Sequence, residues 1–193
     1  LQTEIDACNR ESGLHIQLVR DEPKAFDSFM AHYGKFSGVK NYIAMIGKND
    51  STLDEKCGYY GERLVLKVQG LGLNTCWVAM TYSKIKTAFK VGQGEKICVV
   101  IALGYGETQG IPHKSKAISE VSKIEGVMSD WFKSGIEAAL LAPTAMNQQK
   151  FMFTLNGNKV SVKAGVGFYT KLDLGIAKYH FEIGAGKENF EWA

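Results

Sequence analysis

The chain of 193 residues contains no run of apolar residues long enough to cross a membrane. Its longest apolar run, 97–103, has the length of one β-strand, whereas a membrane-spanning helix needs about 20 apolar residues. The sequence is also poor in arginine, with only Arg10, Arg20 and Arg63 among its 23 basic residues. Because bidentate arginine contacts commonly read base edges, this scarcity and a net charge of only +3 argue against nucleic-acid binding.

The four cysteines lack the spacing of a redox or zinc motif. There is no C-x-x-C pattern, and no cysteine is spaced with histidine as a zinc ligand. Cys76 and Cys98 lie in apolar runs, where an unpaired cysteine behaves as a small hydrophobic residue. The sequence therefore predicts reduced, structural cysteines, no metal site and a cytoplasmic location.

Several segments have the apolar pattern of β-strands. Residues 14–19 alternate between apolar and polar side chains, and residues 42–46 form a short apolar strand. The nearly continuous apolar run over 96–103 predicts a central strand that is covered on both faces. Residues 151–162 predict a hairpin, with its tight turn at Gly157.

Other segments have helical spacing. Apolar residues recur every three or four positions over 60–71 and 172–183, and glycines follow the last turn of each segment. We also expect a helix from Pro23 through Phe29 and Met30, and a short helix over 85–89. Helices and strands mixed without regular alternation predict an α+β fold.

Two stretches of the chain share the same order of elements. Each has a helix end, a polar loop, a strand and a later helix closed by Gly-x-Gly, first over 4–72 and again over 137–186. This order predicts two related halves, 1–112 and 113–193, which pair because each half alone has a thin core. The alternative is that two α+β segments look alike by chance.

Three segments resemble motifs of the FMN-dependent nitroreductase family. Residues 142–149 and the strand after them are similar to A-P-S-x-x-N-x-Q-P-W-x-F, although Lys150 replaces the usual Pro-Trp. Residues 70–77 resemble G-L-G-T-x-W. Residues 103–106 resemble the family's L-G-Y-P segment, and residues 114–116 resemble its basic phosphate-binding pair. The chain is most similar to the duplicated branch of the family, which carries two such halves.

The resemblance implies an α+β, nitroreductase-like fold of the NADH oxidase/flavin reductase type, with two related halves packed as a pseudo-dimer. It implies an enzyme, an FMN-dependent oxidoreductase that uses NADH or NADPH to reduce nitro compounds, quinones or similar small-molecule acceptors. We expect no nucleic-acid or membrane partner, and a monomer (pseudo-dimer) or a homodimer. The alternative is a non-catalytic flavin-binding or interaction protein on the same fold.

The resemblance also implies which residues contact FMN. The two lysines of 114–116 neutralise the phosphate, the loop over 143–147 contacts the ribityl chain and pyrimidine ring, and the main chain over 77–80 approaches the flavin ring. The expected cofactor-binding residues are Trp77, Val78, Ala79, Met80, Lys114, Lys116, Pro143, Thr144, Ala145 and Asn147. We expect no catalytic side chain, because a flavin itself carries the hydride and electrons.

Each of these assignments has a plain structural alternative. The lysines also fit a solvated basic loop, Asn147 fits a residue that satisfies local turn backbone, and Trp77 fits a core residue. The other copies of the motifs are degraded, to Asn-Arg-Glu-Ser over 9–12 and Gly-Ala-Gly-Lys over 184–187, so we expect one surviving site. The family's Arg-rich opening helix is expected to lie before Leu1.

Overall fold

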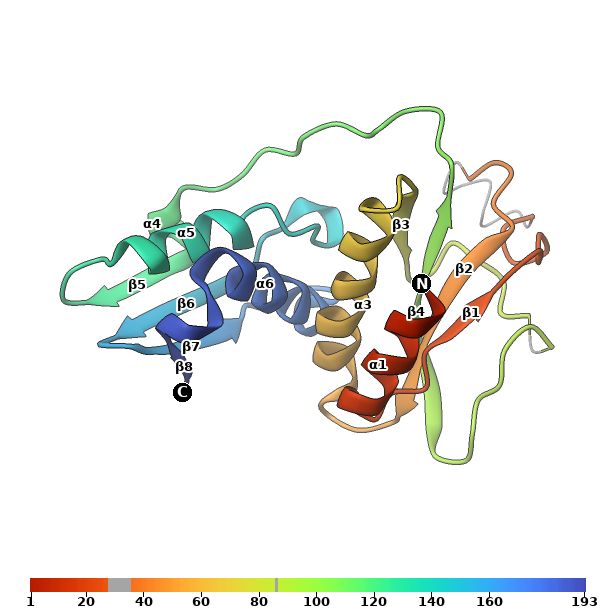
Figure 1. Cartoon of the computed structure of the whole chain (residues 1–193), viewed down its shortest axis with the longest axis horizontal. Helices are drawn as coiled ribbons and strands as arrows, with labels where there is room; N and C mark the ends of the chain where they lie inside the picture. Colours follow the sequence, from red (N-terminus) through yellow and green to blue (C-terminus); the bar gives the residue numbers. More distant parts are fainter. Residues whose placement is uncertain (28–35, 86) are drawn as a thin grey trace. The chain divides into compact units, whose positions relative to one another are not determined.

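The computed structural model shows a mixed α+β protein, as the apolar periodicity predicts (Figure 1). It describes residues 1–27, 36–85 and 87–193. No helix within these ranges is both long and apolar enough to span a membrane.

The chain divides into two compact units. Unit 1 comprises residues 1–53 and 63–110, and unit 2 comprises residues 54–62 and 111–193. Helix α3 (Leu53–Gln69) therefore contributes residues to both units. The relatedness of the predicted halves stays a prediction.

Unit 1 is built on an antiparallel sheet with the strand order β1-β2-β4-β3. Its strands are β1 (Gln17–Val19), β2 (Asn41–Lys48), β3 (Asn74–Val78) and β4 (Glu95–Gly104). Strand β4 pairs with β2 on one side and with β3 on the other, which confirms the predicted central strand.

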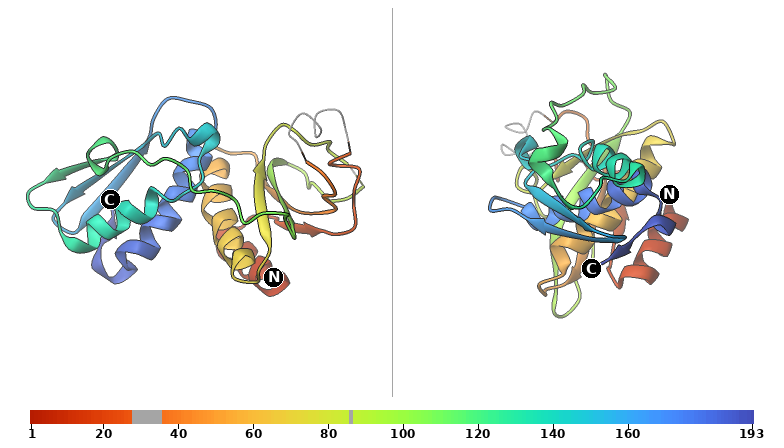
Figure 2. Two further views of the ribbon diagram at one scale, coloured as in Figure 1. Left: turned by 90° about the horizontal axis from the view of Figure 1, so that it is seen from above. Right: turned by 90° about the vertical axis from the view of Figure 1, so that its left-hand side faces the viewer.

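Both faces of this sheet are covered. On one face, Phe26 and Tyr82 pack with strand residues such as Tyr42 and Val100 in an apolar cluster. Helix α1 (Gln2–Ser12) lies beside α3 (Figures 1 and 2). Ile5 of α1 is fully buried.

Strand β1 is shorter than the predicted strand over 14–19. Side chains of α1 bind the backbone just before it: Ser12 Oγ accepts from Leu14 N (3.0 Å), and Asn9 Oδ1 accepts from Ile16 N (2.7 Å). His15 N still donates to the Ile46 carbonyl oxygen of β2 (2.7 Å), but Asn9 binds both backbone groups of Ile16, and the regular ladder with β2 begins only at Gln17.

Two predicted helices of unit 1 are not found in the described residues. Residues 24–26 form only a turn after Pro23, and the rest of that predicted helix, with Phe29 and Met30, lies outside the described residues. The segment 85–89, of which residue 86 is not described, also shows turns instead of a helix. Phe26 and Phe89 are buried in the apolar cluster. Their helix-like spacing in the sequence therefore reflects side chains that pack in this core from irregular backbone.

Unit 2 contains a mixed sheet with the strand order β5-β6-β7-β8. Its strands are β5 (Ser122–Glu125), β6 (Phe151–Asn156), β7 (Lys159–Ala164) and β8 (Glu191–Trp192). Strands β6 and β7 form the predicted hairpin, in which Asn156 pairs with Lys159 and Gly157 has a φ of 61°. The pairs β5–β6 and β7–β8 are parallel.

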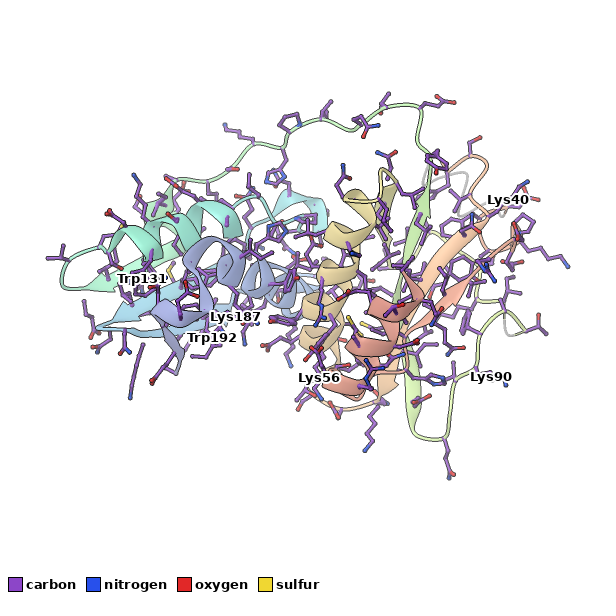
Figure 3. The ribbon with its side chains drawn as sticks, in the orientation of Figure 1. Lys40, Lys56, Lys90, Trp131, Lys187 and Trp192 are labelled. Atoms are coloured by element: carbon purple, nitrogen blue, oxygen red, sulfur yellow. The ribbon has the colours of Figure 1, made fainter. Side chains whose placement is uncertain are left out.

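Helices α5 (Asp130–Ala139) and α6 (Thr170–Ala185) belong to the same unit, with the short helices α4 (Ile118–Val121), η1 (Ala145–Asn147) and η2 (Lys187–Asn189). Their core is aromatic. Phe181 of α6 stacks on Phe153 of β6 with ring centroids 4.8 Å apart and meets Phe132 of α5 edge-on at 5.7 Å. Trp131 packs against Phe132, and Trp192 packs against Phe153 and Phe181. Both tryptophans, which are labelled in Figure 3, also contact Phe190.

Residues 54–62 of α3 cross α6 at two glycines. A Cβ atom on Gly58 would lie 2.0 Å from the Leu172 carbonyl oxygen, and one on Gly175 would lie 2.0 Å from the Glu55 carbonyl oxygen. The backbones of the two helices therefore touch, which only glycine permits at these positions.

Candidate functional site

A group of polar contacts in unit 2 surrounds the loop over 143–149, which connects α5 to β6. Met146, Asn147 and Gln149 have positive φ angles of 51°, 51° and 45°. Side chains other than glycine rarely adopt this conformation, because it is sterically unfavourable. Fixed partners must therefore hold the loop, and the structure supplies them from three places.

The first partner is Lys116. Its Nζ atom donates to the carbonyl oxygens of Gln148 (2.9 Å) and Gln149 (3.0 Å), and its backbone N–H donates to Gln149 Oε1 (2.9 Å). Lys114 is exposed, and its ammonium group has no partner within the described residues. The two lysines of the predicted phosphate-binding pair thus have different surroundings.

The second partner is the backbone carbonyl of Lys114, which accepts from the loop. Gln149, whose side chain is buried within the loop, donates through Nε2 to this oxygen (2.8 Å) and to Asn147 Oδ1 (2.6 Å). Asn147 Nδ2 donates to the same carbonyl oxygen (2.8 Å). The Thr144 hydroxyl accepts from Gln149 N (3.1 Å), so its own proton remains available for a ligand.

The third partner is Asp173 in the first turn of α6, which is only 2% exposed. Its Oδ1 accepts from Ala145 N (3.0 Å), and its Oδ2 accepts from Gln148 Nε2 (2.7 Å). The same Gln148 nitrogen donates to the Phe168 carbonyl oxygen (2.7 Å). Burial raises the pKa of Asp173, although the hydrogen bonds from Ala145 and Gln148 offset part of the rise.

The predicted stretch 77–80 lies in unit 1, at the end of β3. This strand is at the edge of its sheet, so part of its backbone hydrogen-bonding groups point away from β4. Val78 is buried in the apolar cluster, whereas Met80 is 70% exposed. The side chain of Val78 therefore belongs to the core, and only the main chain of this residue can contact a ligand.

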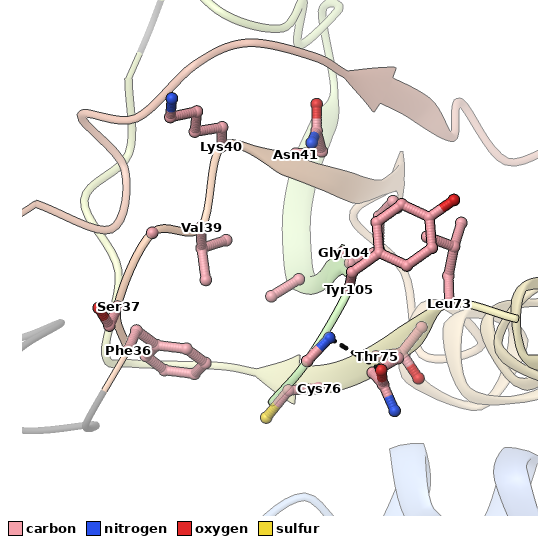
Figure 4. A pocket seen from close by; sticks show the side chains of 15 residues that line it. Phe36, Ser37, Val39, Lys40, Asn41, Leu73, Thr75, Cys76, Gly104 and Tyr105 are labelled. Carbon is pink, nitrogen blue, oxygen red and sulfur yellow. Dashed lines mark hydrogen bonds between the residues drawn. The ribbon is translucent and has the colours of Figure 1, made fainter. Parts of the chain in front are cut away.

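Unit 1 also contains a pocket of about 660 Å³, at the end of β4 (Figure 4). Three segments line it: 36–41, 73–76 and 102–106. The last two belong to the motif segments of the predicted family, but none of the described lining residues is one of the predicted FMN-binding residues. Cys76 is exposed in this pocket, and the atoms around its thiol exclude enough water to raise its pKa above the ordinary value.

The other ionisable clusters of unit 2 connect its helices. His180 Nε2 lies 2.8 Å from Glu62 Oε1, and Glu182 binds the side chains of Tyr59, Lys187 and Trp192 (Figure 3). Burial and the bond to Glu182 raise the pKa of Tyr59 to about 12. Within 1–27, 36–85 and 87–193, no three His, Cys, Asp or Glu side chains are grouped to hold a metal ion.

The structure places the predicted residues in two groups. Those of 114–116 and 143–147 lie together in unit 2, and those of 77–80 form one stretch of unit 1. No site role was predicted for Gln148, Gln149 and Asp173, which organise the loop. Gln148 and Gln149 lie inside the recognised motif, and Asp173 begins a segment, 173–177, that resembles the family's D-x-G-x-A helix start. The contacts of Gln148 with Asp173 and of Gln149 with the Lys114 carbonyl oxygen join residues 25 and 35 positions apart, where local patterns carry no signal.

Comparison with known proteins decides the family. The family model described as Putative TM nitroreductase matches residues 1–185. The chain belongs to this family. Membership assigns it to the nitroreductases, a class of oxidoreductase.

Solved structures agree with this assignment at the level of the fold. The crystal structure of a putative nitroreductase from Thermotoga maritima has a TM-score of 0.63 and 21% sequence identity, over 91% of this chain and 67% of that chain. The nitroreductase-like α+β fold is thereby confirmed, whereas the internal duplication stays a prediction.

Two more distant structures are also similar to this nitroreductase. One is a putative NADH dehydrogenase/NAD(P)H nitroreductase from Bacteroides thetaiotaomicron (TM-score 0.46, 17% identity, 63% of this chain and 83% of that chain). The other is an FMN-dependent nitroreductase from Clostridium difficile (TM-score 0.41, 16% identity, 63% of this chain and 83% of that chain). No match was found among the curated proteins.

Proposed function

We propose that this nitroreductase is an FMN-dependent enzyme that takes electrons from NADH or NADPH. Its acceptors would be nitro compounds, quinones or similar small molecules. The family assignment supports oxidoreductase chemistry, and one structural observation supports the cofactor: a loop, 143–149, is held by hydrogen bonds and is joined through Asn147 to the backbone carbonyl of Lys114, whose own side chain is exposed.

The polar part of FMN fits the donors of this loop. FMN carries a phosphate dianion and a polar ribityl chain, which need a cation and short hydrogen-bonding groups. Lys114 offers the cation and Thr144 offers a hydroxyl proton. Lys116 and Asn147 already hold the loop, so we propose that they chiefly position these groups, and their direct contact with FMN stays a prediction.

In this proposal the chain binds and orients the cofactor and excludes water from it. FMN, when bound, supplies the hydride and electron transfer. Pro143 and Ala145 belong to the loop that contacts the polar chain of FMN in this proposal. The contact of the main chain over 77–80 with the flavin ring, where the small side chain of Ala79 would permit close approach, stays a prediction of the family resemblance. We assign no catalytic acid or base to the chain.

The finer features of the family resemblance belong to the same proposal. We propose that two related halves arose by duplication, because the order of helix end, loop, strand and Gly-x-Gly-closed helix occurs twice. We also propose a cytoplasmic protein, active as a monomer or a homodimer.

The cofactor is tested by adding FMN to the purified protein, removing free FMN by gel filtration and recording the absorbance. We expect a flavin band near ~450 nm in the protein fraction. Lys114→Gln should weaken FMN binding about tenfold, because one charged contact is lost. Lys123→Gln removes an exposed lysine of β5 as a matched control and should leave affinity unchanged. No flavin band after FMN addition would contradict the proposal.

A second function is favoured by one observation. Because Lys116 and Asn147 are engaged inside the loop, the chain offers fewer free ligands than the resemblance implies. A protein that binds flavin without turnover fits this arrangement. It differs from the enzyme in one respect, since its bound flavin would not be reduced by NADH or NADPH.

A further inference from the structure

The buried carboxylate of Asp173 has no partner of opposite charge among its hydrogen-bond donors. Both of its described partners are neutral: the backbone N–H of Ala145 and the side-chain amide of Gln148. Burying a charge is unfavourable unless hydrogen bonds compensate it, and the raised pKa of this group shows that the compensation is incomplete. A role in packing alone does not explain a charge at this position.

We propose that Asp173 is the positioning residue of the FMN site. Its two carboxylate oxygens fix the loop over 144–149 and, through Gln148, the segment over 165–169. This inference rests on the proposed function, since it assigns the role of a residue that does not itself contact the cofactor.

The geometry makes Asp173 the common anchor of both segments. One oxygen holds Ala145, at the start of η1, and the other holds Gln148, just after it. Gln148 uses Nε2 for Asp173 and also for the Phe168 carbonyl oxygen, so the carboxylate determines which way this amide points. A Cβ atom on Gly167 would lie 2.5 Å from Gln148 Oε1, which shows that the second segment packs directly on this side chain.

Only the ionised carboxylate satisfies this arrangement. A carboxylate accepts at both oxygens, whereas the amide introduced by Asp173→Asn has one oxygen and one nitrogen. Its oxygen can accept from Ala145 or from Gln148, and its nitrogen then faces a second donor. Either Gln148 turns its amide oxygen towards the new amide group and loses its hydrogen bond to the Phe168 carbonyl oxygen, or the hydrogen bond from Ala145 N is lost.

Hydrogen–deuterium exchange of the protein without added FMN tests the positioning directly. In Asp173→Asn we expect faster exchange confined to 144–149 and 165–169, with no fall in melting temperature, because the variant no longer buries a charge. Asp130→Asn is the matched control, an exposed acidic residue in the first turn of α5 in the same unit. It should leave exchange unchanged. Exchange that is unchanged in both segments, or raised throughout unit 2 with a lower melting temperature, overturns the proposal.

FMN titration of the same proteins tests the consequence for the site. We expect the dissociation constant of Asp173→Asn to rise about tenfold. Affinity within twofold of the wild type in Asp173→Asn overturns the proposal.

Failure of the variant Asp173→Asn to fold would also decide the question. If Asp173→Asn does not fold, its role is structural and the inference is wrong. Gln148→Ala, at a partly exposed side chain, gives an independent measure of the same contacts and should raise exchange in 165–169 and weaken FMN binding. Wild-type protein that takes up no FMN contradicts the proposed function and the flavin role of Asp173, whereas unchanged exchange in the variant contradicts only the positioning.

Discussion

Two lysines that are two positions apart in the sequence have different roles in this nitroreductase. The ammonium group of Lys116 lies against two carbonyl oxygens of the loop that ends at Gln149, whereas that of Lys114 extends into solvent. A lysine that binds carbonyl oxygens stabilises the fold, and an exposed lysine is available for an anion. Stability and FMN affinity should therefore respond differently to substitution of the two residues.

Replacing Lys116 by methionine should lower the free energy of unfolding by about 1–2 kcal/mol, because two carbonyl oxygens lose a charged donor at a partly exposed position. Lys114→Gln should leave the free energy of unfolding within about 0.5 kcal/mol of the wild type. Urea denaturation followed by circular dichroism measures both. Equal stability of the two variants would show that the contacts of Lys116 do not stabilise the loop.

The raised pKa of Asp173 makes a prediction about pH. The folded protein holds this proton to a higher pH than the unfolded chain, whose carboxyl group has the ordinary value of 3.8. The destabilisation is therefore fully present above the raised folded pKa and disappears as the pH falls below the unfolded value. Asp173→Asn should melt at or above the wild-type temperature at about pH 7, and its advantage should shrink towards about pH 4. Thermal melts across this range measure the difference, and an advantage that grows with acid would contradict the assignment.

At the scale of elements, the contact between α3 and α6 depends on the missing side chains of Gly58 and Gly175. Gly175→Ala places a methyl group against the backbone of α3, which cannot move without displacing the whole helix. We expect a loss of about 3 kcal/mol in the free energy of unfolding. Gly70→Ala is the matched control at the end of α3, where a Cβ atom makes only ordinary contacts and φ is −64°. Chemical denaturation compares the two, and equal stability would show that the helices separate at little cost.

Local signals predicted the elements that local interactions determine. The hairpin at Gly157 and the helix α6 follow from turn chemistry and apolar spacing. The described residues of 85–89 form no helix, because Phe89, and Ile85 and Ala88 beside it, pack in a cluster assembled from distant segments. The start of β1 depends on Asn9, a side chain seven residues away, which no strand pattern contains.

The candidate site shows the same limit. Motif resemblance found the loop and its lysines, because these residues are adjacent in the sequence. It did not find that Lys116 holds the loop, or that Gln149 and Asp173 organise it, since these contacts join residues 25 to 35 positions apart. Which side chain binds a ligand and which one supports it is decided by such contacts.

For the whole molecule, the family and the α+β fold are established. We propose that the loop over 143–149 in unit 2 binds the polar part of FMN. The protein is divided into two compact units, each with its own sheet. We propose that this nitroreductase binds FMN and passes electrons through it.

Anaerobic stopped-flow mixing of the FMN-loaded protein with NADH or NADPH tests this claim most directly. We expect the absorbance near ~450 nm to fall rapidly with at least one of the two donors and to return when a nitro compound or a quinone is added. A flavin that keeps its absorbance with both donors would contradict the claim and identify a flavin-binding protein without turnover.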